Sequence, residues 1–264
     1  TLRPMLLALD IGNSNIVIGA SADGEWTQQW RIQTDADKTA DEYAVLFGNL
    51  FHEAELSYQH FSSIIISSVV PQLTQTISEV FEKHSHTQAL VLNGKVDSGI
   101  EVKTDSPQSV GADLIADAVA GYSLFEEDCI VVDFGTATTA IAVRQPGELI
   151  GGSICAGVKV TVDALVGKAA QLSQIPLEPP KNVIGRNTIE SMQSGLVLGH
   201  ICMIEGRVDR MKQQLSADAK VIATGGLSEK MCAHTDYFDV VDPMLTLDEL
   251  RVIMRRQAEG KGQK

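Results

Sequence analysis

One pattern constrains the fold of this chain more than any other, because it occurs twice. An apolar run ends in an aspartate, a glycine and small polar residues follow, and a second apolar run leads away. The first copy is LLALDIGNSNIVIGA at residues 6–20, and the second is CIVVDFGTATTAIAV at residues 129–143. Asp10 and Asp133 lie 123 residues apart. This spacing is the length of a domain, so the sequence predicts an internal duplication.

Each copy predicts a hairpin that could bind phosphate. A tight turn needs residues that tolerate positive φ, and Gly12 and Asn13 are expected to supply them. Backbone N–H groups beside small hydroxyl and amide side chains form a nest for phosphate oxygens. Asp10, at the strand end, is placed to hold a cation beside them. A single copy could equally be a plain hairpin, but two copies favour a pair of hairpins that grip one polyphosphate from both sides.

Length and charge limit the classes of function. The 264 residues suffice for two modest domains. The net charge of −13 argues against a nucleic-acid partner, whereas a nucleotide site needs only a local field. The four cysteines are scattered without metal-binding spacing, which favours a reducing cytoplasm. No apolar run is long enough to span a membrane, so no membrane partner is expected.

Apolar spacing predicts a similar order of elements after each hairpin. In the first half we expect a strand at 26–32 and then a helix from the Thr39 cap to Glu55, in which Glu42 completes a capping box. A strand at 64–70, a helix at 73–83 and a strand at 89–92 are expected to follow. A helix at 109–124 is expected to bridge the halves. Helices are also predicted at 160–170, 189–215 and 247–257, and a strand at 221–223. The six histidines form no ligand pattern and are expected at the surface.

Motifs along nearly the whole chain carry a resemblance to a known family. The two hairpins resemble those of the sugar kinase, Hsp70 and actin superfamily, and within it the chain resembles the type III pantothenate kinases, also called the Bvg accessory factor family. The further matching segments are TADEY at 39–43, SSVVP at 67–71, VGAD at 110–113, GG at 151–152, VIGRNT at 183–188, MQSG at 192–195 and ATGG at 223–226.

The resemblance implies an α/β fold of two duplicated ribonuclease-H-like domains. Each would hold a mixed five-stranded sheet with helices, and the active-site cleft would lie between them. The expected domains are residues 1–118, with the first phosphate hairpin, and residues 119–264, with the second. The resemblance also implies a homodimer, formed through the long helices of the second domain.

The implied activity is ATP-dependent phosphorylation of pantothenate to 4′-phosphopantothenate, the first step of coenzyme A biosynthesis. Asp10 would hold Mg²⁺, and Asp133 would hold a monovalent cation, potassium or ammonium. Asp133 could alternatively be a second phosphate-loop aspartate without an ion. The implied ATP and phosphate contacts are Asp10, Ile11, Gly12, Asn13, Ser14, Asn15, Ile16, Val17, Gly135, Thr136 and Thr138.

The remaining implied residues concern the acceptor alcohol. Asp113 matches the family's proton acceptor, although local sequence alone favours a helix cap. The implied substrate contacts are Thr104, Gly111, Ala112, Asp113, Leu114 and Thr188. Thr188 could also be the N-cap of the following helix. The segment TGG at 224–226 could bring backbone close to an adenine or ribose, or could simply form a turn.

The chain departs from the family pattern on the acceptor side. Leu114 stands where the family has arginine after Gly-Ala-Asp, and Thr104 stands where a tyrosine is usual. In Gly151–Gly157, Ala156 stands where the usual Gly-Gly-x-Ile-x-Pro-Gly motif has proline. An arginine-to-leucine change removes a charge and five hydrogen-bond donors. Two alternatives therefore remain open, namely a kinase for another small alcohol and an ATP-binding regulatory homologue without turnover.

Overall fold

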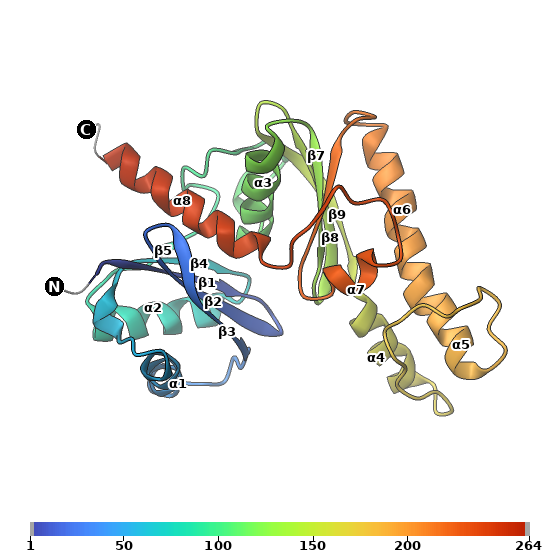
Figure 1. Cartoon of the computed structure of the whole chain (residues 1–264), viewed down its shortest axis with the longest axis horizontal. Helices are drawn as coiled ribbons and strands as arrows, with labels where there is room; N and C mark the ends of the chain where they lie inside the picture. Colours follow the sequence, from blue (N-terminus) through green and yellow to red (C-terminus); the bar gives the residue numbers. More distant parts are fainter. Residues whose placement is uncertain (1–2, 262–264) are drawn as a thin grey trace. The chain divides into compact units, whose positions relative to one another are not determined.

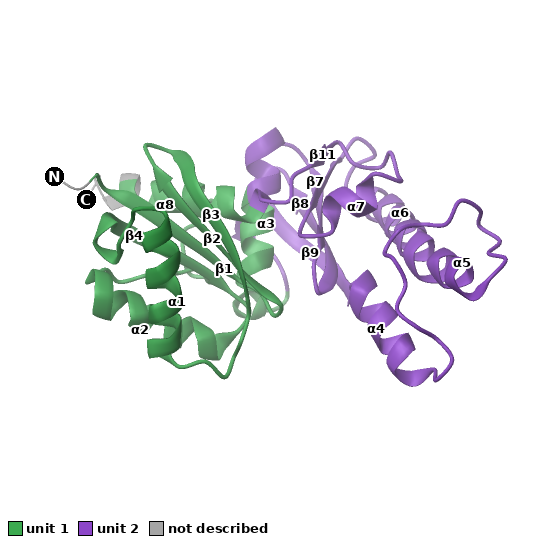
Figure 2. Ribbon diagram, turned by 60° about the horizontal axis from the view of Figure 1, so that its bottom comes forward, with its two compact units in different colours: residues 1–99, 105–119, 246–264 green, residues 100–104, 120–245 purple. Residues whose placement is uncertain are grey.

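The structure is a computed structural model that describes residues 3–261 (Figure 1). The outermost parts of the two predicted domains, residues 1–2 and 262–264, lie outside the described residues. The chain forms two compact units (Figure 2). Unit 1 comprises Thr1–Gly99, Asp105–Val119 and Thr246–Lys264, and unit 2 comprises Ile100–Thr104 and Ala120–Leu245. Within the described chain, each unit is built on one mixed sheet with helices.

The sheet of unit 1 has the strand order β3-β2-β1-β4-β5. Its strands are β1 (Met5–Ile11), β2 (Asn15–Ala22), β3 (Glu25–Gln33), β4 (Phe61–Ser68) and β5 (Leu90–Val91). The first three form an antiparallel meander, and β4 and β5 continue the sheet in parallel from β1. This mixed arrangement agrees with the predicted order of strands and helices.

Helices α1 (Ala40–Glu53) and α2 (Pro71–Ser85) cover one face of this sheet (Figure 1). The predicted capping box is present, since Glu42 Oε2 accepts from Thr39 N at 2.8 Å and Thr39 Oγ1 accepts from Glu42 N at 3.4 Å. The core has Leu7, Leu9 and Ile11 from β1, packed with aromatic residues of α1. Because strand side chains alternate, Asp10 faces the opposite side of the sheet.

That opposite face is covered by α8 (Leu245–Lys261), and α8 also contacts α3 (Ala112–Phe125). Trp26 Nε1 donates to Asp248 Oδ1 at 2.8 Å, Arg251 donates to the Gly24 carbonyl, and Thr246 Oγ1 donates to Asp117 Oδ1 at 3.2 Å. Through these contacts the described residues 246–261 belong to unit 1, whereas the sequence assigned them to the second domain.

Unit 2 repeats the topology and adds one strand. Its sheet has the order β11-β10-β7-β8-β9-β6. The repeated strands are β7 (Cys129–Phe134), β8 (Ala137–Arg144), β9 (Glu148–Ala156), β10 (Lys220–Thr224) and β11 (Val240–Val241). The additional strand, β6 (Glu101–Val102), pairs in parallel with β9. Among the described residues the sheet is therefore six-stranded rather than five-stranded, and residues 100–104 belong to unit 2.

The helices of unit 2 pack on one face of this sheet. They are α4 (Val158–Lys168), α5 (Thr188–Met192), the π-helix η3 (Gln193–Leu198), α6 (Gly199–Lys212) and α7 (Ser228–Cys232). The predicted long helix at 189–215 is thus three consecutive helical segments, one of them a π-helix. Two 3₁₀ turns lie elsewhere, at Tyr58–His60 and Pro107–Ser109. Of the helices described, none combines the length and apolar character needed to cross a membrane.

Candidate nucleotide and phosphate site

The first hairpin joins β1 to β2 and is tied to the end of β3. Gly12 N donates to Asn15 O at 3.0 Å across the turn. Thr34 Oγ1 donates to Gly12 O at 2.7 Å, and Thr34 N donates to Ser14 O at 3.0 Å. The side chains of Asn13, Ser14 and Asn15 are exposed at the tip. The turn is therefore braced from one side while its amide and hydroxyl groups face outward.

The geometry of this turn differs from the prediction. Neither Gly12 nor Asn13 adopts a positive φ. The strands pair from Ile11 to Ile16, which leaves four residues in the loop. Loops of this length are most often built around a type I turn, which needs no positive φ. Gly12 is instead favoured by close packing, because a Cβ there would lie 3.2 Å from the Asn15 carbonyl oxygen.

The second hairpin joins β7 to β8 and is held by the segment that follows β9. Gly135 N donates to Ala137 O at 3.0 Å, and Gly157 N donates to Thr136 O at 2.9 Å. A Cβ on Gly157 would overlap the carbonyl oxygens of Gly135 and Thr136, so only glycine fits at this crossing. Thr136 is exposed, as a phosphate contact requires.

Thr138 does not present its hydroxyl to solvent. It is 1% exposed, and Thr138 Oγ1 lies 3.0 Å from His200 Nε2 of α6. The expectation that the histidines lie at the surface is therefore wrong for His200, which is 6% exposed. The available signal was its spacing, because His200 lies three residues from Val197 and four from Ile204 on the apolar side of the helix.

Each hairpin aspartate lies beside a buried hydroxyl on the adjacent parallel strand. Asp10 is in register with Ser67 of β4, and Asp133 is in register with Thr224 of β10, so each pair shares a face of its sheet. The hydroxyls of Ser67 and Thr224 are buried and have no hydrogen-bond partner within the described part of the chain. Thr139 lies opposite Asp133 on the other flanking strand.

Such oxygen groups fit the implied cations. Carboxylate and hydroxyl oxygens are the ligands that hard cations prefer, and an unpartnered buried hydroxyl is costly unless something binds it. The Asp133, Thr139 and Thr224 side chains therefore form a suitable donor set for a monovalent cation in unit 2. Asp10 and Ser67 form the smaller corresponding set in unit 1.

The turn after β10 closes against Asp133. Gly225 has φ of +92°, and a Cβ there would overlap Asp133 Oδ1. Leu227 N donates to Phe134 O at 3.2 Å, which fixes the turn against the second hairpin. The segment at 224–226 is thus a turn whose backbone approaches the carboxylate of the hairpin.

Asp113 is the second residue of α3 and bonds to the start of its own helix. Asp113 Oδ1 accepts from Leu114 N at 2.8 Å, so the carboxylate binds a free N–H group of the first turn from inside the helix and is not its N-cap. Burial raises the pKa of the Asp113 carboxyl above 3.8, against the opposing effect of its backbone hydrogen bonds. Gly111 allows the carboxylate to fold back, because a Cβ there would overlap Asp113 Oδ1.

The expected substrate contacts are divided between the two units. Gly111, Ala112 and Leu114 accompany Asp113 in unit 1, and Leu114 is half-buried. Thr104 and Thr188 belong to unit 2. The Thr104 hydroxyl is buried, and no described residue bonds to it.

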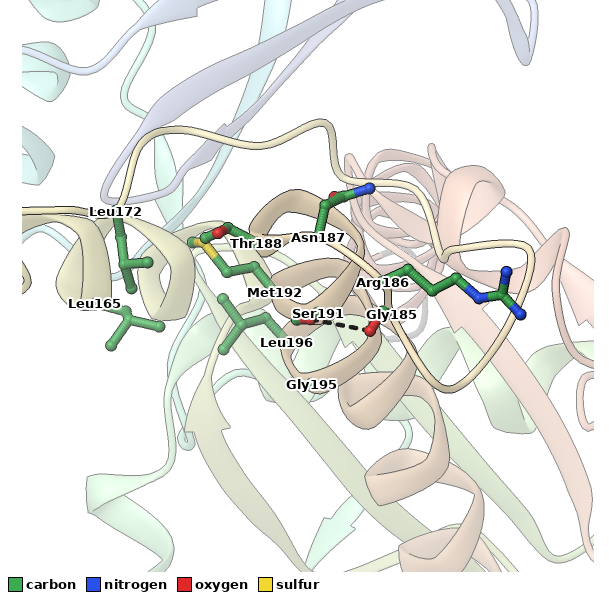
Figure 3. Close-up of a pocket in the computed structure, with 10 residues that line it drawn as sticks. All are labelled: Leu165, Leu172, Gly185, Arg186, Asn187, Thr188, Ser191, Met192, Gly195 and Leu196. Atoms are coloured by element: carbon green, nitrogen blue, oxygen red, sulfur yellow. Dashed lines mark hydrogen bonds between the residues drawn. The ribbon is translucent and has the colours of Figure 1, made fainter.

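Thr188 lines an open pocket of about 540 Å³ within unit 2 (Figure 3). The N-cap of α5 is Asn187 rather than Thr188, since Asn187 Oδ1 accepts from Glu190 N at 2.9 Å. Figure 3 shows that the Arg186 side chain extends away from the leucines that line the other end. The residues that line the pocket are Leu165, Leu172, Gly185, Arg186, Asn187, Thr188, Ser191, Met192, Gly195 and Leu196.

Solved structures of other proteins share this fold. A protein described as a Baf family transcriptional activator from Campylobacter jejuni has a TM-score of 0.63 at 17% identity, covering 96% of this chain and 99% of that one. MreB 5 of Spiroplasma citri, bound to AMPPNP, has a TM-score of 0.59 at 7% identity, covering 98% of both chains. Component A of the (R)-2-hydroxyglutaryl-CoA dehydratase of Acidaminococcus fermentans has a TM-score of 0.56 at 11% identity, covering 98% and 99%. The chain therefore has the two-domain α/β fold of the actin, Hsp70 and sugar-kinase-like ATPases.

Sequence comparison then defines the family within this class. The family model for type III pantothenate kinase matches residues 6–210, which include both hairpins and the start of α3. The chain belongs to the type III pantothenate kinase family.

Proposed function

We propose that this protein transfers the γ-phosphoryl group of ATP to pantothenate, forming 4′-phosphopantothenate and ADP at the first step of coenzyme A biosynthesis. Membership of the family supports the substrate. The observation that carries the proposal is the duplicated hairpin, in which a strand ends in an aspartate beside a buried hydroxyl in both units. Two matched oxygen sites of this kind suit a triphosphate with its cations.

The two hairpins are assigned to the phosphates. The exposed tip from Gly12 to Asn15 would contact the triphosphate in unit 1, with the adjoining Ile11, Ile16 and Val17 shaping the strand ends. In unit 2, Gly135 and Thr136 would contact the phosphates. The Thr138 hydroxyl is buried, so Thr138 would instead help to hold the backbone of the hairpin in place. Braced turns of this kind are set before the nucleotide arrives, which limits the cost of ordering on binding.

The aspartates are assigned to the cations. Asp10 would hold Mg²⁺ beside the phosphates, with the Ser67 hydroxyl nearby in register. Asp133 would hold potassium or ammonium with Thr139 and Thr224. The bound cations would supply neutralisation of the charge on the transferred group.

Asp113 is assigned the role of general base for the hydroxyl group of pantothenate. As the hydroxyl oxygen of pantothenate forms its bond to the γ-phosphorus, the bond to the β,γ-bridging oxygen breaks and ADP leaves. The hydroxyl proton passes to the Asp113 carboxylate. A raised pKa improves this role, because a general base works best when its pKa approaches the working pH.

A second function is favoured by one feature of the acceptor side. Leu114 follows Asp113 where the family has an arginine, so an anionic substrate loses a partner of opposite charge. This supports an alternative in which the protein phosphorylates another small alcohol, or binds ATP as a regulator without turnover.

We also propose a cytoplasmic homodimer. In unit 2, Val183 and Ile184 are 70% and 82% exposed, and Ile154 is 70% exposed. Exposed aliphatic side chains of this kind are common at contacts between proteins, and sedimentation velocity would test the dimer.

An ADP-release assay with Mg²⁺ and potassium tests the proposed reaction. Parallel reactions would contain pantothenate, other small alcohols such as glycerol and glucose, or no acceptor. The proposal expects ADP release only with pantothenate. Release with another alcohol supports a different kinase, and ATP binding without release in any reaction supports the regulatory alternative.

A further inference from the structure

Helix α6 is linked to Thr138 of the second hairpin directly through His200 and indirectly through Cys155. His200 Nε2 lies 3.0 Å from Thr138 Oγ1. Farther along the same helix, Arg207 Nη1 donates to Cys155 Sγ at 3.3 Å, and Cys155 Sγ donates to the Thr138 carbonyl at 3.4 Å. His200 and Arg207 are seven residues apart, so both lie on the side of α6 that faces β8.

The contact with His200 is buried in an apolar core. The Phe134 and His200 rings are 6.4 Å apart between centroids, and Phe134, Ile201 and Ile204 belong to the same core cluster. Burial, together with the charge of Arg207, lowers the pKa of the imidazole. The ring is therefore neutral near pH 7, and Nε2 forms an uncharged hydrogen bond with the hydroxyl.

A core position of this kind would ordinarily hold an apolar residue. A buried imidazole loses its hydration, and only a satisfied partner offsets that cost. A satisfied buried polar pair fixes one geometry, whereas apolar contacts tolerate small displacements. The π-helix that immediately precedes α6 agrees with a specialised role, because such segments occur frequently at functional sites.

We propose that His200 is a positioning residue of the nucleotide site, which fixes Thr138 and thereby the phosphate-contacting turn at Gly135 and Thr136. Phe134 and Thr138 face each other across the hairpin, so a shift of Thr138 moves the turn that connects them. The inference rests on the proposed ATP site and adds to it a residue that does not touch the nucleotide.

The test compares binding of Mg–ATP with binding of adenosine, which has no phosphates. His200→Leu removes the hydrogen bond, Thr138→Val removes it from the other side, and the double variant removes both groups. His200→Gln keeps a polar atom near the position of Nε2. His234→Leu is the matched control, because His234 is exposed in the same unit. Calorimetry would measure binding, and thermal unfolding would measure stability.

We expect His200→Leu and Thr138→Val each to weaken Mg–ATP binding by roughly three- to tenfold, the effect of one net hydrogen bond. Adenosine binding should not change, the double variant should be no weaker than either single variant, and His200→Gln should recover most of the loss. Thr138→Val is close to isosteric, so it decides the matter if His200→Leu does not fold.

Parallel losses for Mg–ATP and adenosine, additive effects in the double variant, or lowered stability with unchanged Mg–ATP binding would each overturn the inference. If the wild-type protein binds no Mg–ATP, the proposed function fails as well. If the wild type binds and the variants bind equally well, only the role of His200 fails.

Discussion

Replacement of Asp113 by asparagine separates the two roles that the structure permits for this residue. Asp113 Oδ1 accepts a hydrogen bond from Leu114 N, and asparagine keeps an oxygen in that position. The helix start should therefore remain intact. Asparagine cannot accept the hydroxyl proton, however, so the proposed chemical step loses its base.

The expected magnitudes differ for rate and stability. Loss of a general base lowers kcat by roughly 10²- to 10⁴-fold, while the KM for ATP should change little. Asp113→Ala removes the base and this hydrogen bond together. It should show a similar loss of rate and an additional loss of about 0.5–1.5 kcal/mol in the free energy of unfolding.

The pH dependence of stability provides an independent measurement. Because burial raises the pKa of Asp113 above 3.8, the folded state binds this proton more readily than the unfolded state does. The ionised carboxylate therefore lowers the free energy of unfolding above the raised pKa, and this cost disappears as the pH falls below 3.8. The Asn variant should be most favoured relative to wild type near neutral pH, and the difference should shrink in acid.

Steady-state kinetics and denaturant titrations between pH 3.5 and 7.5 would check both expectations. Asp37→Asn is a suitable control, since Asp37 is an exposed aspartate of unit 1. A near-wild-type kcat for Asp113→Asn would show that Asp113 serves only to hold the start of the helix. A stability difference from wild type that does not vary with pH would refute the argument from burial.

Three further predictions follow from the same site. If Asp133 holds a monovalent ion, potassium or ammonium should raise the rate over sodium at fixed Mg²⁺, and equal rates in all three salts would exclude the ion. The KM for pantothenate should exceed that of an arginine-bearing relative by roughly ten- to a hundredfold, because one charge-assisted hydrogen bond contributes ~1.5–3 kcal/mol. Leu114→Arg should lower this KM part of the way, and an unchanged KM would indicate a differently built pocket. Gly157→Ala should cost about 1–3 kcal/mol of stability and weaken Mg–ATP binding, because its Cβ would overlap the Gly135 carbonyl oxygen. Gly167→Ala, with open space around its Cβ in α4, should instead be neutral or stabilising, and equal effects of the two would contradict the packing argument.

Much of the fold could be predicted because its main signals are local. The two hairpins lie in consecutive residues, and the capping box at Thr39 depends on residues three apart. Strand β6 and the docking of α8 could not be found in this way. Two-residue strands have no periodicity, and β6 pairs with β9 across more than forty residues. Helix α8 is held in unit 1 by partners such as Trp26, which lies more than 200 residues away.

The candidate site was predictable in its residue types and less so in its orientations. The aspartates follow from the repeated pattern. The burial of Thr138 follows from strand alternation only after the core face is known, since Phe134 opposite it packs in the core. The position of Ser67 beside Asp10, and of Thr224 beside Asp133, depends on the register between distant strands.

The most direct test of the proposed function is identification of the phosphorylated product. The protein would be incubated with Mg²⁺, potassium, pantothenate and ATP labelled at the γ-phosphate. The products would then be separated and identified by their masses in mass spectrometry. The proposal predicts pantothenate carrying one labelled phosphoryl group, formed in a 1:1 ratio with ADP, and formed roughly 10²- to 10⁴-fold more slowly by Asp113→Asn. Unmodified pantothenate after ATP has been shown to bind, or label released only as inorganic phosphate, would contradict it.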